Sequence, residues 1–261
     1  MPVIESNGCP IDVEVSGSDR APVLMLASSL GTTKHMWDPQ MDAFTSQYRV
    51  VRYDRRGHGK SGTPKGPYSM EMLARDALAI MDGLKLDKIN WLGLSMGGME
   101  GMWLGANAGE RIDKLILSNT SAHYPDKTMW HTRMEAVSKA GSVAAVADTV
   151  INGWLTKDFQ AAHPDVTARM KEMMIATPVE GYLGCCAAVR DMDHRALLKQ
   201  INVPTLIIAG SKDPATNVAA AESIRDQIGG SKLAIVDAAH IANVEAPHDY
   251  AKVVLDFLGS K

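Results

Sequence analysis

The first half of the chain alternates short apolar runs with longer segments whose apolar residues recur at helical spacing. Short apolar runs bounded by turn residues are typical of buried strands, and spacings of three and four residues are typical of helices. Met70, Leu73, Ala77 and Ile80, for example, would share one helix face. We expect strands at residues 23–27, 48–53, 88–92 and 114–117 and helices at residues 70–84 and 97–108.

This alternation stops near residue 121, and the pattern is then mostly helical until about residue 196. Beyond that point we expect strands at residues 203–209 and 232–236 and helices at residues 219–228 and 246–258. Strands that alternate with helices pair in parallel and carry helices on both faces of the sheet. The sequence therefore predicts an α/β fold with a mostly parallel, doubly wound sheet. Residues 1–121 and 196–261 would form the core, and residues 122–195 would form a helical lid insert.

Composition and charge narrow the function classes. A hydrophobic content of 46% and a charged content of 22% are ordinary for a globular protein, and a net charge of −3 argues against nucleic-acid binding. No apolar run approaches the roughly 18 residues of a membrane span, and the first residues lack the layout of a signal peptide. Three cysteines, two of them adjacent, make a poor disulfide framework. We expect a cytoplasmic protein with no nucleic-acid or membrane partner.

The central chemical signal is Gly93-Leu94-Ser95-Met96-Gly97. This pattern occurs by chance in many proteins, but here a predicted strand runs into it and a predicted helix leaves it. A strand–turn–helix context is what a nucleophile elbow requires, because the serine sits on a strained turn that only small neighbours permit. We interpret Ser95 as the nucleophile of a serine hydrolase, against the alternative of a glycine-rich turn with an incidental serine.

A serine nucleophile needs a base, and the base needs an acid that orients it. Among eight histidines, His240 follows the last predicted strand and precedes the final helix, which places it at the sheet edge of Ser95. Asp213 follows the strand at residues 203–209, and the chain order Ser95, Asp213, His240 is the order of an α/β-hydrolase. The alternative for Asp213, followed by proline, is simply to begin a turn.

The oxyanion of such a reaction needs backbone N–H donors. One should be the amide of Met96, directly after the nucleophile, and the other should come from the loop after the first strand, where we choose Leu30. The segment from Tyr53 to Gly62 lacks the spacing of a phosphate loop, so we interpret it as a structural loop. No metal-ligand spacing occurs, and we expect neither a metal nor a cofactor.

Together these residues resemble the α/β-hydrolase superfamily over the whole chain. The finer resemblance is to the 3-oxoadipate enol-lactonases of bacterial aromatic degradation. It rests on Ser28-Ser29-Leu30-Gly31-Thr32-Thr33-Lys34-His35-Met36-Trp37, on Tyr53-Asp54-Arg55-Arg56-Gly57-His58-Gly59 and on the elbow. In the insert it rests on Gly181-Tyr182-Leu183-Gly184-Cys185-Cys186-Ala187-Ala188-Val189-Arg190-Asp191, and Ala239-His240-Ile241-Ala242-Asn243-Val244-Glu245 adds to it. Ala242 departs from the small hydroxyl residue that is more usual there.

The resemblance implies that Ser95 attacks a lactone carbonyl and that the enol-lactone is opened to 3-oxoadipate. The substrate carries a free carboxylate, so a local cation should bind it. The candidates are Arg133 and Arg190 in the insert and Lys34 near the oxyanion loop, with Trp130 and Trp154 as pocket walls. For each of these residues a surface or packing role is the alternative.

Two other functions remain open from the sequence. The first is another hydrolase of the same fold: a carboxylesterase, a carbon–carbon-bond hydrolase or a perhydrolase. The second is a ligand-sensing protein that uses the fold as a binding pocket. An incomplete triad would favour the sensor, whereas all three positions are filled here.

Overall fold

The computed structural model describes residues 2–260 and has eight strands in one sheet. The strands are β1 (Val3–Ser6), β2 (Cys9–Ser16), β3 (Val23–Ala27), β4 (Arg49–Tyr53), β5 (Ile89–Leu94), β6 (Ile112–Ser118), β7 (Thr205–Gly210) and β8 (Lys232–Val236). Their order in the sheet is β1-β2-β4-β3-β5-β6-β7-β8. The pairs β1–β2 and β2–β4 are antiparallel, and every pair from β4 to β8 is parallel. The predicted α/β-hydrolase sheet is confirmed.

The amino-terminal hairpin of β1 and β2 is an element that the sequence interpretation omitted. Its turn is formed by Asn7 and Gly8, which both have positive φ, at 46° and 75°. Asn-Gly is the strongest short signal for such a two-residue hairpin turn, because both residues tolerate this backbone conformation. The signal was therefore present, and the hairpin extends the sheet by two strands at the edge next to β4.

Helices cover both faces of the sheet. The helical elements of the core are η1 (Lys34–Gln40), α1 (Met41–Thr45), α2 (Met70–Gly83), α3 (Met96–Asn107), η2 (Gly109–Arg111), α9 (Arg195–Leu198), α10 (Val218–Arg225), α11 (Ala242–Glu245) and α12 (Pro247–Gly259). Successive residues of β3 face opposite sides, as the period of a strand requires. Leu24 and Leu26 join the core under η1, α1 and α12, whereas Met25 and Ala27 join the core under α2, α3 and α10.

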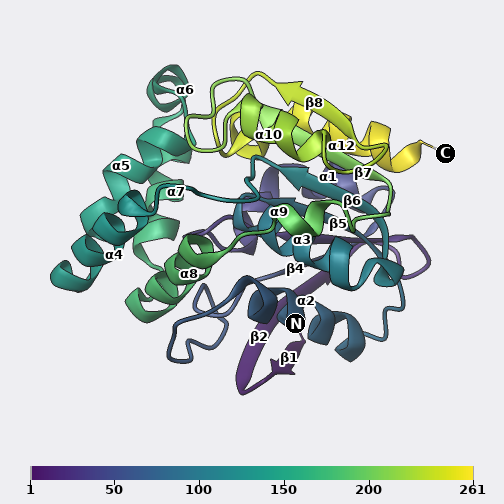
Figure 1. Cartoon of the computed structure of the whole chain (residues 1–261), viewed down its shortest axis with the longest axis horizontal. Helices are drawn as coiled ribbons and strands as arrows, with labels where there is room; N and C mark the ends of the chain where they lie inside the picture. The colour runs from purple at the N-terminus through teal and green to yellow at the C-terminus, as the bar shows by residue number, and fades with distance from the viewer. Residues whose placement is uncertain (1, 261) are drawn as a thin grey trace.

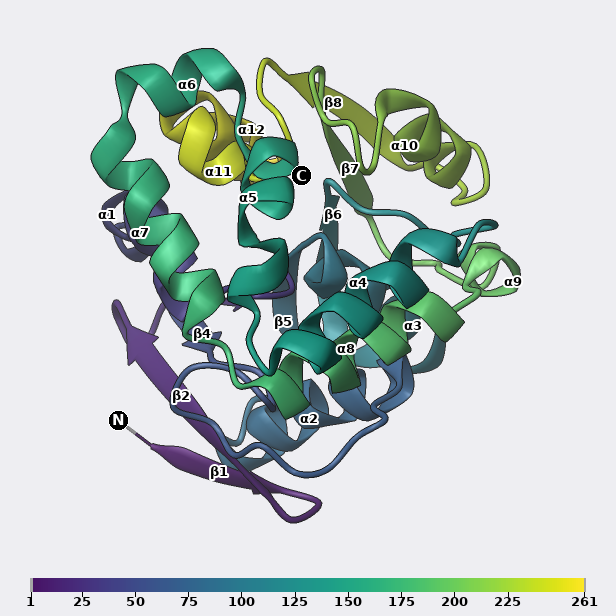
Figure 2. The ribbon, with the colours of Figure 1, turned by 90° about the vertical axis from the view of Figure 1, so that its left-hand side faces the viewer.

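The segment between β6 and β7 folds into helices. They are α4 (Thr128–Ala140), α5 (Ala144–Trp154), α6 (Lys157–Ala162), α7 (Pro164–Ile175) and α8 (Val179–Asp191). Figure 1 shows these helices gathered at one side of the sheet. In Figure 2 that side faces the viewer, and α4, α5, α7 and α8 lie in front of the strands. We call α4–α8 the lid. Helix α9 includes residue 196, where the sequence analysis expects the core to resume, and it packs against α3 of the core.

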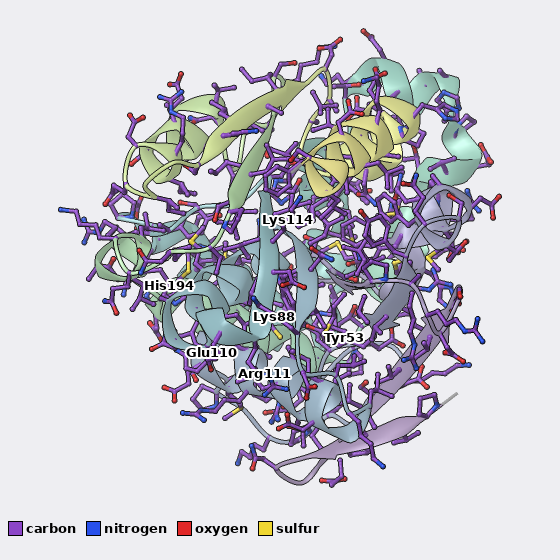
Figure 3. All side chains as sticks on the ribbon, turned by 90° about the vertical axis from the view of Figure 1, so that its right-hand side faces the viewer. Tyr53, Lys88, Glu110, Arg111, Lys114 and His194 are labelled. Atoms are coloured by element: carbon purple, nitrogen blue, oxygen red, sulfur yellow. The ribbon has the colours of Figure 1, made fainter. Side chains whose placement is uncertain are left out.

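The opposite side of the molecule carries no lid. Figure 3 views it, with Lys88, Glu110, Arg111 and Lys114 labelled near the amino ends of β5 and β6. Lys114 donates to the carbonyl oxygens of Phe257 and Leu258, where a cation is favourable at the end of α12. None of the helices between residues 2 and 260 is long and apolar enough to cross a membrane.

Two glycine backbones bring the lid against the core. Gly57, in the loop after β4, has φ +78°, and Gly181 lies in the first turn of α8. A Cβ atom on either glycine would overlap backbone atoms of the other. Two main chains can approach this closely only when neither residue has a side chain. This contact holds α8 on the loop that follows β4.

We expect Gly181→Ala to lower the free energy of unfolding by about 1–3 kcal/mol, as overpacking does. Alanine favours a helix by about 1 kcal/mol over glycine, but the new methyl group meets backbone that has no side chain to move aside. Gly153→Ala in α5 is the matched control, because a Cβ there meets open space. Urea unfolding of both variants measures the difference. A Gly181→Ala variant as stable as Gly153→Ala would contradict the close contact.

Candidate active site

Ser95 lies at the turn between β5 and α3 with φ +58° and ψ −113°. A non-glycine residue adopts this conformation rarely, and the surrounding structure must hold it. Here the Ser95 amide donates to Ser118 O at 2.8 Å, and the Thr120 hydroxyl donates to Ser95 O at 2.8 Å. Gly97 packs so tightly on Ala27 of β3 that a Cβ would overlap it. The strained turn is therefore fixed by its neighbours in the sheet.

The structure brings the three predicted triad residues together. His240 Nε2 lies 2.9 Å from Ser95 Oγ, and His240 Nδ1 lies 2.8 Å from Asp213 Oδ2. Asp213 comes from the loop after β7 and His240 from the loop after β8, at the carboxyl edge that also carries Ser95. All three side chains are buried. The neighbouring carboxylate favours the neutral tautomer of His240 that carries its proton on Nδ1. In that tautomer Nε2 has a free lone pair and can accept the serine proton.

Asp213 is held by more donors than the histidine alone. Its carboxylate accepts hydrogen bonds from the amides of Ala215 and Thr216, the Thr216 hydroxyl and the Asn119 side chain. Burial raises the pKa of Asp213, but the charge and hydrogen bond of His240 and the bonds from Thr216 outweigh it and hold this pKa below its ordinary value. Asp213 is thus kept ionised, as an orienting acid must be.

Asn119 and Thr216 were missed from the sequence. Asn119 directly follows β6, and its side-chain amide donates to Asp213, which follows β7. The only sequence signal for Asn119 was its position directly after a strand. Other polar residues at this edge of the sheet have the same position, so the signal did not single it out. Thr216 lies three residues after Asp213, a spacing at which a hydroxyl reaches back to a carboxylate.

The backbone N–H groups of the two predicted oxyanion donors have no hydrogen-bond acceptor in the part of the chain that the structure describes. The N–H groups of Leu30 and Met96 make no hydrogen bond to any part of the chain between residues 2 and 260. Met96 opens α3, and the first amides of a helix have no partner within it. Both residues border the same cavity as Ser95 and His240. Two free donors beside a nucleophile suit a developing negative oxygen.

The lid supports the histidine loop on both sides of His240. The amide of Ile241 donates to Trp154 O at 3.0 Å, at the end of α5. The amide of Ala239 donates to Glu245 at 2.9 Å, and the same carboxylate accepts from the Thr156 hydroxyl of the lid. The position of His240 therefore depends on hydrogen bonds to the lid.

A cavity of about 90 Å³ lies between the triad and the lid. Its lining residues are Ser29, Leu30, Ser95, Met96, Met99, Tyr124, Met129, Trp130, Arg133, Thr149, Val150, Gly153, Trp154, Tyr182, Val189, Ala215 and His240. The wall is mostly apolar with a few polar groups, which is typical of a small-molecule site. Two of those polar groups, Trp130 Nε1 and Tyr182 Oη, are buried and have no hydrogen-bond partner between residues 2 and 260.

Three of the five predicted substrate residues border this cavity. Trp130 and Trp154 form walls, and the Arg133 guanidinium lies 4.8 Å from the centre of the Trp130 ring. Tyr182, which the sequence interpretation did not select, also borders the cavity. Burial raises the pKa of Tyr182, and the nearby charge of Arg133 partly opposes that rise. Tyr182 belongs to the stretch that carried the family resemblance, which was the available signal.

Lys34 and Arg190 do not border the cavity, and this corrects the sequence interpretation. Lys34 is 1% exposed, and its ammonium is paired with Asp12 of β2. Arg190 pairs with the exposed Asp191 at 2.6 Å and is not among the residues that line the cavity. No group of three or more histidine, cysteine, aspartate or glutamate side chains between residues 2 and 260 is placed to hold a metal ion.

Known proteins agree with this architecture. A family model described as the alpha/beta hydrolase fold matches residues 22–247. The chain is 36% identical to 3-oxoadipate enol-lactonase 2 of Acinetobacter baylyi, over 91% of this chain and 89% of that protein. It is 34% identical to 3-oxoadipate enol-lactonase 1 of the same organism, over 99% and 96%.

A solved structure is similar over the full length. The crystal structure of the enol-lactonase from Burkholderia xenovorans LB400 matches with a TM-score of 0.97 and 38% identity. The match covers 99% of this chain and all of that one. Since the family model spans most of the chain and both relatives exceed 30% identity, this protein belongs to the α/β-hydrolase family.

Proposed function

We propose that this hydrolase opens 3-oxoadipate enol-lactone to 3-oxoadipate, with Ser95 as nucleophile, His240 as general base and Asp213 as the acid that orients it. The observation that carries the proposal is the hydrogen-bonded chain of these three residues beside a cavity that also holds an arginine. The two Acinetobacter relatives bear the name of this activity. As part of the proposal we place the enzyme in the cytoplasm, since its three cysteines are unpaired.

The proposed reaction begins when Ser95 Oγ attacks the lactone carbonyl and His240 Nε2 takes the hydroxyl proton. The carbonyl oxygen becomes negative and accepts hydrogen bonds from the amides of Leu30 and Met96. When the ring C–O bond breaks, the leaving oxygen is an enolate, which departs more readily than an ordinary alkoxide. The leaving oxygen takes the proton from His240, and the resulting enol tautomerises to the ketone of the product.

The acyl-enzyme is then hydrolysed. Because the leaving oxygen belongs to the same ring, the whole substrate stays attached to Ser95 at this stage. Water attacks the acyl carbon while His240 takes its proton, and the tetrahedral intermediate again rests on the two amides. Collapse releases the second carboxylate of 3-oxoadipate and restores the serine.

Arg133, Tyr182 and Trp130 form the proposed subsite for the free carboxylate. Arg133 makes no ion pair with a carboxylate between residues 2 and 260, although it borders a largely apolar cavity. Tyr182 Oη and Trp130 Nε1 are buried donors without a partner. An unmet buried donor is unfavourable unless something completes it, and a carboxylate accepts from all three groups at once. A neutral ester offers these donors only uncharged, weaker acceptors.

The first test follows the ultraviolet loss of the enol-lactone with the purified protein, beside a simple aryl ester and an enzyme-free control. We expect rapid opening of the lactone and a loss of at least about 10³-fold for Ser95→Ala, as removal of a serine nucleophile causes. Fast turnover of the aryl ester with an untouched lactone would contradict the substrate. Full activity of Ser95→Ala would contradict the nucleophile.

The second test separates the carboxylate subsite from the chemistry. Arg133→Met should raise KM for the lactone about 10- to 100-fold, the worth of a charge-assisted hydrogen bond, and leave KM for its methyl ester unchanged. Arg190→Met is the matched control, since this arginine lies outside the cavity on the same lid. Steady-state kinetics with both substrates give the comparison. If both variants behaved alike, Arg133 would not bind the carboxylate.

A further inference from the structure

His58 is a buried histidine that has no part in the proposed reaction, yet it contacts the loop that supplies an oxyanion donor. It lies in the loop after β4 and is fully buried. Its Nε2 atom accepts a hydrogen bond of 2.9 Å from the amide of Gly31, the residue that follows Leu30. The sequence analysis interpreted the segment from Tyr53 to Gly62, which includes His58, as a structural loop.

The acceptor role of Nε2 requires a neutral imidazole with its proton on the other nitrogen. His58 Nδ1 lies 3.3 Å from Arg56 O, where it donates. Burial and the charge of Arg55 lower the pKa of His58 to about 3, with the bond to Arg56 O opposing them. The ring therefore remains an acceptor for Gly31 throughout the neutral pH range.

Arg55 holds the other end of the same loop. Its guanidinium donates to Ser28 O at 2.7 Å and pairs with Glu100 of α3 at 2.8 Å. Tyr53, labelled in Figure 3, donates its hydroxyl to the same Glu100 at 3.0 Å. Because α3 begins with Met96, Arg55 links the loop of one oxyanion donor to the helix of the other.

The lid closes over this loop from the other side. Gly31 has φ +77°, and a Cβ there would meet side-chain atoms of Met174, Tyr182 and Trp154 at 3.3 to 3.7 Å. The loop is thus confined between the lid and the side chains of Arg55 and His58. Without an acceptor at position 58, the Gly31 amide would be left buried and unpaired, and the adjacent peptide would turn to find a partner.

We propose that His58 is a positioning residue of the oxyanion hole: its Nε2 atom fixes the Gly31 amide and thereby aims the neighbouring Leu30 N–H at the developing oxyanion. Arg55 completes the arrangement through the Ser28 carbonyl. This inference rests on the proposed function, since it assigns a role in the same reaction. A misaimed donor weakens binding of the tetrahedral intermediate and hardly affects the planar substrate, so the loss falls on kcat and not on KM.

The test compares His58→Leu with His58→Gln. Leucine removes the acceptor at similar bulk, whereas the glutamine carbonyl oxygen can occupy the place of Nε2. We expect His58→Leu to lower kcat about 10- to 100-fold, less than full loss of a donor, with KM within about 3-fold of the parent. Its affinity for a trifluoromethyl ketone, which forms a tetrahedral adduct with the serine, should fall in parallel, while affinity for 3-oxoadipate stays the same. His58→Gln should recover most of the loss.

Adjacent arginines provide the matched control. Arg55 and Arg56 are both 3% exposed, and each pairs with one buried carboxylate, but Arg56 pairs with Asp76 and donates to Ser6 O, away from the oxyanion loop. Arg55→Lys should lower kcat and trifluoromethyl ketone affinity, and Arg56→Lys should lower only the melting temperature. This pair decides the matter even if His58→Leu fails to fold.

Several results would overturn the inference. Unchanged kcat and inhibitor affinity in His58→Leu would do so, as would equal effects of Arg55→Lys and Arg56→Lys on kcat. A His58→Gln variant as slow as His58→Leu would assign the loss to the ring itself and not to its acceptor. If Ser95→Ala abolishes turnover while His58→Leu leaves it intact, only this inference fails. If Ser95→Ala remains active, the proposed function fails with it.

Discussion

The strained backbone of Ser95 is the constraint on which the rest of the site depends. A serine at φ +58° turns the chain from β5 into α3 and leaves Oγ at the carboxyl edge of the sheet. Such a conformation costs about 1–3 kcal/mol, and here the cost is met by hydrogen bonds to Ser118 and Thr120 and by the close approach of Gly97 to Ala27. Parallel strands end at one edge, so the loops after β7 and β8 deliver Asp213 and His240 to the same place.

The lid contributes more than a cover. Trp154 lines the cavity with its side chain and accepts from Ile241, next to His240, with its carbonyl oxygen. Gly181 brings α8 onto the loop that carries Arg55 and His58. The walls of the cavity and the supports of the base and of the oxyanion loop are therefore parts of one packing arrangement. A change in the lid that alters the cavity therefore also acts on the loops that carry His240 and Leu30.

The sheet and the grouping of Ser95, Asp213 and His240 can be predicted from the sequence because both depend on local, one-dimensional signals. Buried strands are continuous apolar runs, and the strand–turn–helix context of Ser95 together with chain order leads to Asp213 and His240. The hairpin of β1 and β2 was missed although Asn7-Gly8 signals it, because both of its strands mix apolar with polar residues. Lys34 was assigned to the substrate because it is a cation near the oxyanion loop. Its ion-pair partner Asp12 is distant in sequence, so the sequence pattern does not reveal that pairing.

The sequence could not show in the same way which lid residues border the cavity and which do not. Arg133 and Arg190 are similar cations in the same insert, and helical periodicity does not say which face of a helix meets the core. Only the packing of α4 and α8 places Arg133 at the cavity and Arg190 outside it. The unpaired Trp130 Nε1 and Tyr182 Oη are likewise features of three-dimensional packing. The proposed reaction type therefore rests on sequence order, whereas the proposed substrate subsite rests on tertiary contacts.

Covalent labelling with a fluorophosphonate tests the central claim most directly, because this reagent phosphonylates an activated serine. The account predicts one label per chain, located on Ser95 by peptide mass spectrometry, with lactone opening lost in proportion to the label and protection by 3-oxoadipate. A protein fully labelled on Ser95 that still opened the lactone would contradict the account, and so would stoichiometric inactivation through a label on any other residue.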